Sequence, residues 1–247
     1  MAPKKIYRNL KKALAEPALV THLDLSIAGR RAPVVELAAL PALEVLSLRT
    51  PHPSFDLTAT LEAAAQCPRL RELGLFDGTV SALPPNLAKL RGLTRIDVWN
   101  SGLETWPDAL EALPSLRAFM VLRHGLGATP EALGSFPSLE HLVLQRGSLV
   151  AVPTLPPGLG TLDLSANQLA EVPDAVAPLR RLAYVSLQAN PELLSLPRWF
   201  VDLPDLRYVE VSASAGRPAL AAWKAAGRDV ACRLYEDEAP YELAENS

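Results

Sequence analysis

Hydrophobic and polar positions follow one six-residue pattern that returns along most of the chain. The pattern is Leu-x-x-Leu-x-Leu, in which Ile, Val or Phe can replace Leu. Because its last two apolar positions are two residues apart, a strand places both on one face and the residues between them on the other. The nine copies begin at Val20, Leu43, Leu70, Leu93, Leu116, Leu139, Leu159, Leu182 and Leu206.

The copies are closely periodic, and an interval of 23 residues separates Leu70 from Leu93, Leu93 from Leu116, Leu116 from Leu139 and Leu159 from Leu182. One unit cannot bury its leucine row alone, whereas stacked units form a continuous core. Two proline columns share the period, one starting each return segment and one ending it. They are Pro84, Pro107, Pro130, Pro153, Pro173 and Pro197, and Pro41, Pro68, Pro114, Pro137, Pro157 and Pro204. The pattern predicts a solenoid of about nine parallel strands.

One copy carries a family resemblance. Leu159-Gly-Thr-Leu-Asp-Leu-Ser-Ala-Asn167-Gln-Leu169, followed by Glu171-Val172-Pro173, resembles the consensus of the leucine-rich repeat (LRR) family. The opening Tyr7-Arg-Asn-Leu-Lys-Lys-Ala-Leu-Ala-Glu-Pro17, which runs into Val20-Thr-His-Leu-Asp-Leu-Ser26, resembles the N-terminal cap of intracellular bacterial LRR proteins. The resemblance implies an α/β fold, a right-handed β/α superhelix or horseshoe. Parallel strands would line its concave face, and helical, 3-10 or extended segments its convex face.

The resemblance also implies a role for one asparagine in each turn. In the family, Asn at the end of the strand bonds neighbouring backbone groups in a ladder, and this chain has Asn167 and Asn190 there. The other turns must satisfy their backbone groups in another way. They carry Ala28, Pro51, Gly78, Ser101, His124, Gly147 and Ser214.

We expect three segments: an N-terminal helical cap at residues 1–18, the solenoid at 19–216, and a C-terminal cap with an acidic tail at 217–247. Apolar residues at helical spacing predict an amphipathic helix over residues 3–15 that covers the first repeat, with membrane contact as the alternative. Residues 218–226 read as a short helix and 229–235 as a final edge strand. The tail contains Glu236, Asp237, Glu238, Glu242 and Glu245.

Two repeats depart from the common length. The unit beginning at Leu43 carries an insertion at 51–56, which we expect either to bulge from the turn edge or to lengthen a convex helix. The unit beginning at Leu139 is short, and its segment 152–158 is too rich in proline for a helix. This short unit resembles the repeats of secreted bacterial effectors that end in a ubiquitin ligase domain. The Cys-x-Asp motif of that domain is matched by neither Cys67-Pro-Arg69 nor Cys232-Arg-Leu234.

Composition narrows the class of function. A formal net charge of −3 without a basic stripe argues against nucleic acid as a partner. No apolar run is long enough to span a bilayer. The two cysteines, Cys67 and Cys232, lie at opposite ends of the repeats and favour a reducing, cytoplasmic location.

The sequence contains no group of potential catalytic residues with a persuasive spacing. The histidines His22, His52, His124 and His141 are scattered over four repeats, and we expect His124 on the solvated surface of a turn. Asp24, Asp97 and Asp163 share an outward repeat position but are too far apart to act as an acid and base pair. We therefore expect a non-enzymatic protein with no metal and no cofactor.

The residue after the last strand leucine should face the concave side. This column reads Ser26, Arg49, Phe76, Trp99, Leu122, Gln145, Ser165, Gln188 and Ser212. Three consecutive repeats place large apolar groups there, and Met120 and Val143 add to them from an outward position two residues earlier. Arg49, Arg123 and Arg146 would lie at the edge of this patch. An apolar centre with an arginine-rich edge is typical of binding hot spots, although single apolar residues are also common on ordinary surfaces.

These observations predict a bacterial, cytoplasmic module that recognises a protein or peptide partner on its concave face. The candidate partner-binding residues are Phe76, Trp99, Met120, Leu122, Val143, Arg49, Arg123 and Arg146. One alternative is an inhibitor or regulatory subunit of an enzyme, such as a nuclease, protease or small GTPase, using the same face. Another is an effector-type LRR protein without its catalytic domain. The oligomeric state stays open, with a monomer favoured.

Overall fold

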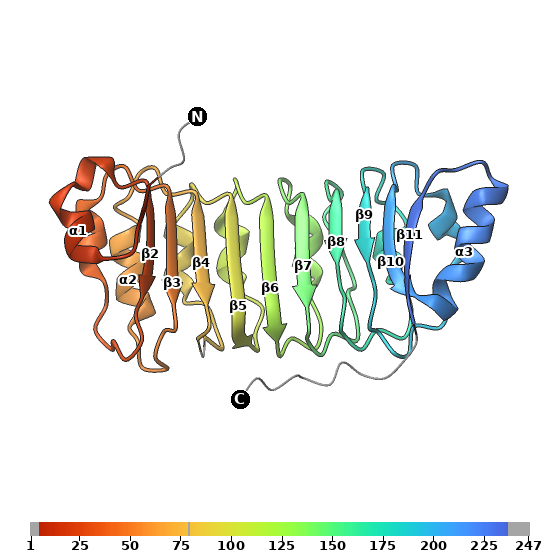
Figure 1. The fold of residues 1–247 in the computed structure, drawn as a ribbon, viewed down its shortest axis with the longest axis horizontal. Helices are drawn as coiled ribbons and strands as arrows, with labels where there is room; N and C mark the ends of the chain where they lie inside the picture. The colour runs from red at the N-terminus through yellow and green to blue at the C-terminus, as the bar shows by residue number, and fades with distance from the viewer. Residues whose placement is uncertain (1–4, 79, 237–247) are drawn as a thin grey trace. The chain divides into compact units, whose positions relative to one another are not determined.

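A computed structural model describes residues 5–78 and 80–236, except for the side chain of Ser101. It divides into two compact units, Met1–Gly125 and Leu126–Ser247. Both units consist of parallel strands joined by short return segments, so the repeats predicted from the leucine pattern are confirmed in each (Figure 1). The expected boundaries at residues 18 and 216 stay a proposal.

The first unit is a parallel sheet in which each strand pairs with the next along the chain. The inward side chains of neighbouring strands are register partners, for example Leu46 with Leu73 and Leu73 with Ile96. All three are at most 1% exposed, so these rows form the core. The strands are β1 (Ile6–Tyr7), β2 (His22–Ser26), β3 (Val45–Arg49), β4 (Glu72–Phe76), β5 (Arg95–Leu103) and β6 (Ala118–His124).

The return segments of the first unit are mostly short 3-10 helices: η1 (Pro17–Leu19), η2 (Val35–Ala39), η3 (Pro85–Lys89) and η4 (Asp108–Ala112). The long repeat instead forms the α-helix α2 (Leu57–Ala64). The Asp56 carboxylate caps it by accepting a hydrogen bond from the Ala59 N–H at 2.8 Å. Of the two outcomes expected for the insertion, the lengthened helix is therefore confirmed.

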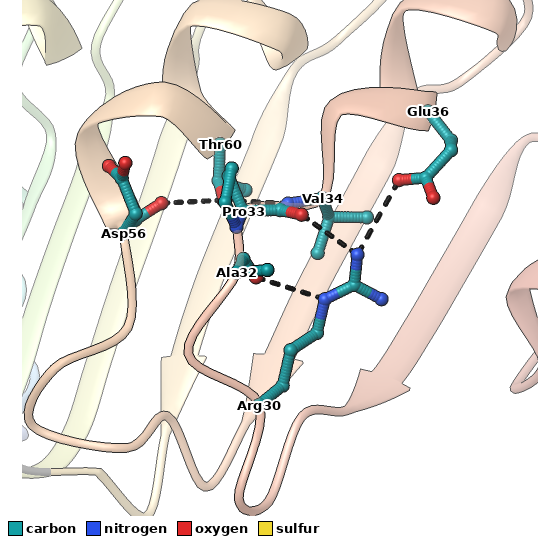
Figure 2. Close-up of polar contacts among 7 residues, drawn as sticks. All are labelled: Arg30, Ala32, Pro33, Val34, Glu36, Asp56 and Thr60. Carbon is teal, nitrogen blue, oxygen red and sulfur yellow. Dashed lines mark hydrogen bonds and ion pairs between the residues drawn. The ribbon is translucent and has the colours of Figure 1, made fainter.

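Helix α2 is attached to the preceding repeat by polar contacts (Figure 2). The Thr60 hydroxyl donates to the Asp56 carbonyl at 2.8 Å and accepts from the Val34 N–H at 3.0 Å. Arg30 lies beside this segment, donating to the carbonyls of Ala32 and Pro33. The buried Thr60 hydroxyl thus satisfies the backbone N–H of Val34 in the preceding repeat.

The helix predicted over residues 3–15 is only partly correct. The segment forms β1 and then the shorter helix α1 (Leu10–Ala15), whose N-cap Asn9 accepts a hydrogen bond from the Lys12 N–H at 3.1 Å. Ile6 is exposed and Tyr7 is buried, because they alternate as a strand does and pair with β2. The first two residues of the predicted helix lie outside the described residues.

The second unit repeats the arrangement with shorter strands. They are β7 (His141–Gln145), β8 (Thr161–Asp163), β9 (Tyr184–Ser186), β10 (Tyr208–Ser212) and β11 (Ala231–Tyr235), each parallel to the next. The 3-10 helices η5 (Glu131–Ser135), η6 (Asp174–Val176) and η7 (Arg198–Asp202) lie in the return segments. Residues 152–158 form no helix, as the prolines predicted.

The asparagine ladder implied by the resemblance is confirmed in this unit. The Asn167 amide donates to the carbonyls of Leu144 and Leu164, at 2.7 and 3.0 Å, and accepts from the Leu149 N–H at 3.2 Å. Asn190 bonds in the same way one repeat later and donates to Leu164 at 3.0 Å. Both side chains are almost fully buried, so each satisfies several backbone groups that water cannot reach.

The C-terminal end closes with a helix and a strand, as predicted, but α3 (Ala213–Ala225) begins five residues earlier than residue 218. Trp223 of α3 is fully buried. Arg228 donates to the carbonyls of Val201, Leu203 and Pro204 at the end of η7. The final strand β11 pairs with β10. Apart from Glu236, the predicted acidic tail lies outside the described residues.

Candidate binding surface

Four predicted site residues lie side by side in the first unit. Arg49, Phe76, Trp99 and Leu122 are consecutive register partners on β3, β4, β5 and β6. They lie on the face opposite the buried leucine rows, which we call the open face. Trp99 is 41% exposed, Arg49 is exposed, and Phe76 and Leu122 are half-buried. We refer to these four residues as the aromatic row.

The side chains of the aromatic row support one another. The rings of Phe76 and Trp99 meet edge to face, with centroids 5.5 Å apart and an interplanar angle of 85°. The Arg49 guanidinium lies 4.7 Å from the centroid of the Phe76 ring. Its Nε donates to Asp24 Oδ1 at 2.8 Å. Such ring pairs contribute about 0.5–1.5 kcal/mol beyond area burial, so Trp99 is held in place before any partner arrives.

Gly74 makes room for the Phe76 ring. A Cβ atom at Gly74 would lie 2.3 Å from Phe76 Cε2 and 2.7 Å from its Cζ. The ring therefore lies across the glycine, and any larger residue there would displace it. Sequence reasoning missed this residue, although a glycine at an outward strand position is the signal for such a close approach.

The backbone hydrogen bonds between neighbouring strands continue past the aromatic row into the turns that follow it. The N–H of Thr50 donates to the Phe76 carbonyl at 2.7 Å, and that of Asp77 donates to the Trp99 carbonyl at 3.0 Å. Each residue that follows the row has a positive φ, at Thr50, Asp77, Asn100 and Arg123, from 53° to 61°. Asp and Asn tolerate this conformation, whereas a β-branched Thr is strained in it. The bonds to the next strand hold the row at a fixed place.

The predicted site residues outside the aromatic row belong to both units. Met120 is half-buried on β6 and Arg123 is exposed directly after the row. Val143, half-buried on β7, and Arg146, exposed after it, belong to the second unit. The candidate surface described here is therefore confined to the first unit.

Two outward residues, Asp163 and Ser165, and one turn residue, His124, are buried, contrary to expectation. Asp163 is 6% exposed and Ser165 is 4% exposed, because the Asp163 carboxylate accepts hydrogen bonds from the Ser165 N–H at 3.0 Å and from the Gln145 side chain. His124 is 6% exposed and takes the repeat position that Asn167 has in its own turn. A solvated His124 was therefore the wrong prediction.

Other chemistry is sparse in the part of the chain that the structure describes. Within it no three His, Cys, Asp or Glu residues are placed to hold a metal ion. No helix among the same residues has the length and apolar character needed to cross a membrane. Both cysteines are free thiols, and burial raises the pKa of Cys67 to about 11.

Comparison with known proteins gives fold neighbours alone, since no family model and no curated protein match the chain. A Leptospira interrogans LRR protein, LIC12759, is 19% identical, with a TM-score of 0.53 over 95% of this chain and 83% of that one. The internalin InlF of Listeria monocytogenes is 14% identical, with a TM-score of 0.63 over 94% and 74%. The functional domain of Listeria InlJ, which includes a cysteine ladder, is 17% identical, with a TM-score of 0.56 over 83% and 46%. The chain therefore has the leucine-rich repeat fold.

Proposed function

We propose that the protein is a binding module that recognises a protein or peptide partner through the open face of its first unit, with Trp99 at the centre. One observation carries the proposal: Trp99 is 41% exposed on a strand while its neighbours hold it from the side. An exposed tryptophan loses apolar contact with water when a partner covers it. Because its position is already fixed, little side-chain entropy is lost on binding.

The composition of the aromatic row fits an interface. Tryptophan and arginine are the residue types most enriched at binding hot spots, and these spots are surrounded by contacts that exclude water. Arg49 and Arg123 lie at the edge, with Leu122 and Met120 as apolar neighbours. We place the binding protein in the cytoplasm and assign it no reaction of its own, and a bacterial source accords with its fold neighbours from Leptospira and Listeria.

Binding has one of two consequences for the partner. An inhibitor or regulatory subunit of an enzyme would use the same surface and change the rate of its partner. An effector-type protein without its catalytic domain would bind without such a change. Assay of the captured partner, with and without the protein, separates these alternatives.

The test is the substitution Trp99→Ala in titration calorimetry against a partner captured from the source cell. We expect weaker binding by about 2 kcal/mol or more, the range of an aromatic hot spot. The melting temperature should hardly change, because the indole points away from the leucine core.

Two controls keep the result specific. Trp199→Ala makes the same change in η7, and Ser212→Ala makes a small change on β10; neither should alter the affinity. Normal binding by the Trp99 variant together with weak binding by a control variant would place the site outside the aromatic row. Unfolding of the Trp99 variant would show that the residue is part of the core.

A further inference from the structure

The open face of the second unit carries a different chemistry from that of the first. Tyr184 on β9 and Tyr208 on β10 are register partners, and their rings stack with centroids 5.6 Å apart and an interplanar angle of 6°. Glu210 follows Tyr208 on the same face two residues later. Asp163 on β8 completes the group. We call Asp163, Tyr184, Tyr208 and Glu210 the acid–tyrosine surface.

The two carboxylates lie on either side of one buried serine. Ser186 is the register partner of both Asp163 and Glu210, so the two acidic residues are two strands apart, about 10 Å by the usual strand spacing. The Ser186 hydroxyl donates to Glu210 Oε2 at 3.3 Å, and the Tyr184 hydroxyl donates to the same oxygen at 3.2 Å. Asp163 is 6% exposed, and the Glu210 side chain is 12% exposed.

Asp163 is a buried charge with neutral partners. It accepts hydrogen bonds from the Gln145 side chain and the Ser165 N–H, and no ion pair reaches it among the residues that the structure describes. Burial raises the pKa of this carboxyl, and the charge of Glu210 raises it further. A buried carboxylate is costly without a counter-charge, so a cation from outside would stabilise the surface.

Glu210 already attracts one cation of the chain, and this contact indicates the kind of ligand. Arg233 of β11 lies 3.9 Å from the Glu210 carboxylate, with its side chain 62% exposed. Its guanidinium lies 5.0 Å from the centroid of the Tyr235 ring. An arginine held between a carboxylate and a tyrosine ring is thus built into the neighbouring strand.

We propose that the acid–tyrosine surface receives a basic side chain, arginine in preference to lysine, of a protein partner. Charge complementarity selects the occupant, because two largely buried carboxylates share this face with one exposed arginine. A guanidinium can bond a carboxylate while its plane lies against a tyrosine ring, which an ammonium group does less well. This surface belongs to the second unit, and its function does not depend on the aromatic row.

The test uses a nine-residue peptide of alternating glycine and arginine, labelled with a neutral dye, and follows its anisotropy. Peptides with lysine or glutamine in place of arginine serve as probes of charge and shape. We expect saturable binding of the arginine peptide, weaker binding of the lysine peptide and none of the glutamine peptide. Equal binding of the arginine and glutamine peptides, or no binding of the arginine peptide, would overturn the proposal.

Variants locate the binding. Glu210→Gln keeps an acceptor oxygen for Tyr184 and Ser186, and Asp163→Asn keeps one for Ser165. Each variant should bind the arginine peptide about thirtyfold more weakly, the lower end of the effect of removing one partner of a buried charge pair. Glu192→Gln removes the same charge from an exposed loop and should change the affinity less than about twofold. Equal losses in all three variants would reduce the effect to net charge and contradict a site on this surface.

The pH dependence of peptide affinity separates the contribution of Asp163 from an effect of net charge. The groups that face the surface are His141, Asp163, Tyr184, Tyr208, Glu210, Arg233 and Tyr235. Because the pKa of Asp163 is raised, this carboxyl is protonated at a higher pH than an ordinary Asp, and peptide affinity should fall as it is protonated. The Asp163→Asn variant should lose that step, and persistence of the same step in this variant would exclude Asp163 from the site.

Discussion

Leu162 lies in the core of the second unit with no exposed surface, as does Leu164. Replacing Leu162 by Ala removes buried methyl groups and leaves a cavity that the neighbouring rows fill only in part. We expect the free energy of unfolding to fall by about 2–5 kcal/mol. A denaturant titration measures the change, and an unaltered midpoint would contradict the inward position of the residue.

Unlike Leu162, the ionised Asp163 side chain is expected to destabilise the folded protein. Its pKa in the folded protein is above its ordinary value of 3.8, so the unfolded chain ionises more readily than the folded one. Folding stability should therefore rise as the pH falls from neutral through the folded pKa. Asp163→Asn, which keeps a hydrogen-bond acceptor, should be at least as stable at pH 7 and should lose this part of the pH dependence.

Thermal melts of both proteins from pH 7 to 4 measure the difference. Glu171→Gln, at an exposed position in the following loop, should keep the pH dependence of the unchanged protein. A marked loss of stability at pH 7 in the Asp163→Asn variant would mean that the charge is stabilising.

The inward residues could be predicted from the sequence and several outward ones could not. Leu162 follows from spacing alone, because alternate residues of a strand share a face. The burial of Asp163 goes with its hydrogen bonds to the Gln145 side chain and the Ser165 N–H. Gln145 lies 18 residues from Asp163 in the sequence, and no local pattern predicts their contact.

Helix α2 gives a prediction at the scale of one element. Cys67 follows this helix, is 5% exposed and donates a weak hydrogen bond to the Leu37 carbonyl at 3.2 Å. Burial raises the pKa of the thiol to about 11, so little reactive thiolate forms at pH 8.

In a Cys232→Ser background, Cys67 should react with a thiol reagent only as fast as α2 or the whole unit opens. The absorbance of the thiol reagent's product, followed with and without denaturant, measures the reaction rates of the unfolded and the folded protein. Rapid reaction of the folded protein would contradict the packing of α2 against η2.

The N-terminal elements give a second prediction. Deleting residues 1–16 removes β1 and α1, which exposes one edge of β2 and the apolar side chains that Tyr7 and Ala13 cover. An uncovered edge invites pairing between chains, so the truncated protein should aggregate. Sedimentation with and without anionic vesicles is the measurement; a soluble, stable product that has only lost vesicle binding would favour a membrane role.

At this scale the strands were easier to predict than the helices. Each copy of the leucine pattern carries three apolar positions in fixed phase, and the nine predicted strands correspond to β2–β10. The segment before Asn9 has only Ile6 and Tyr7 to report a strand, and two residues set no period. Its pairing with β2, which lies farther along the chain, decided the outcome.

At the scale of the whole molecule, the repeated pattern determines the fold because each repeat must bury its leucine row against the neighbouring repeat. Partner identity has no such repeated cause. It depends on a few exposed side chains, and their arrangement needs the register, the close approach at Gly74 and the ion pair between Arg49 and Asp24. Tyr184 and Tyr208 share a repeat position two residues after the first leucine, a signal that was available in the sequence and that only their stacking made meaningful.

The central claim, that the open face of the first unit binds the partner, is tested most directly by site-specific photo-crosslinking. Glu72 is exposed on β4, on the same face as Phe76 and outside the aromatic row, whereas Glu111 is exposed on η4 on the side of the return segments. A photoreactive residue at position 72 should cross-link the captured partner, and one at position 111 should not. Cross-linking from position 111 and none from position 72 would contradict the assignment of the binding surface to the open face.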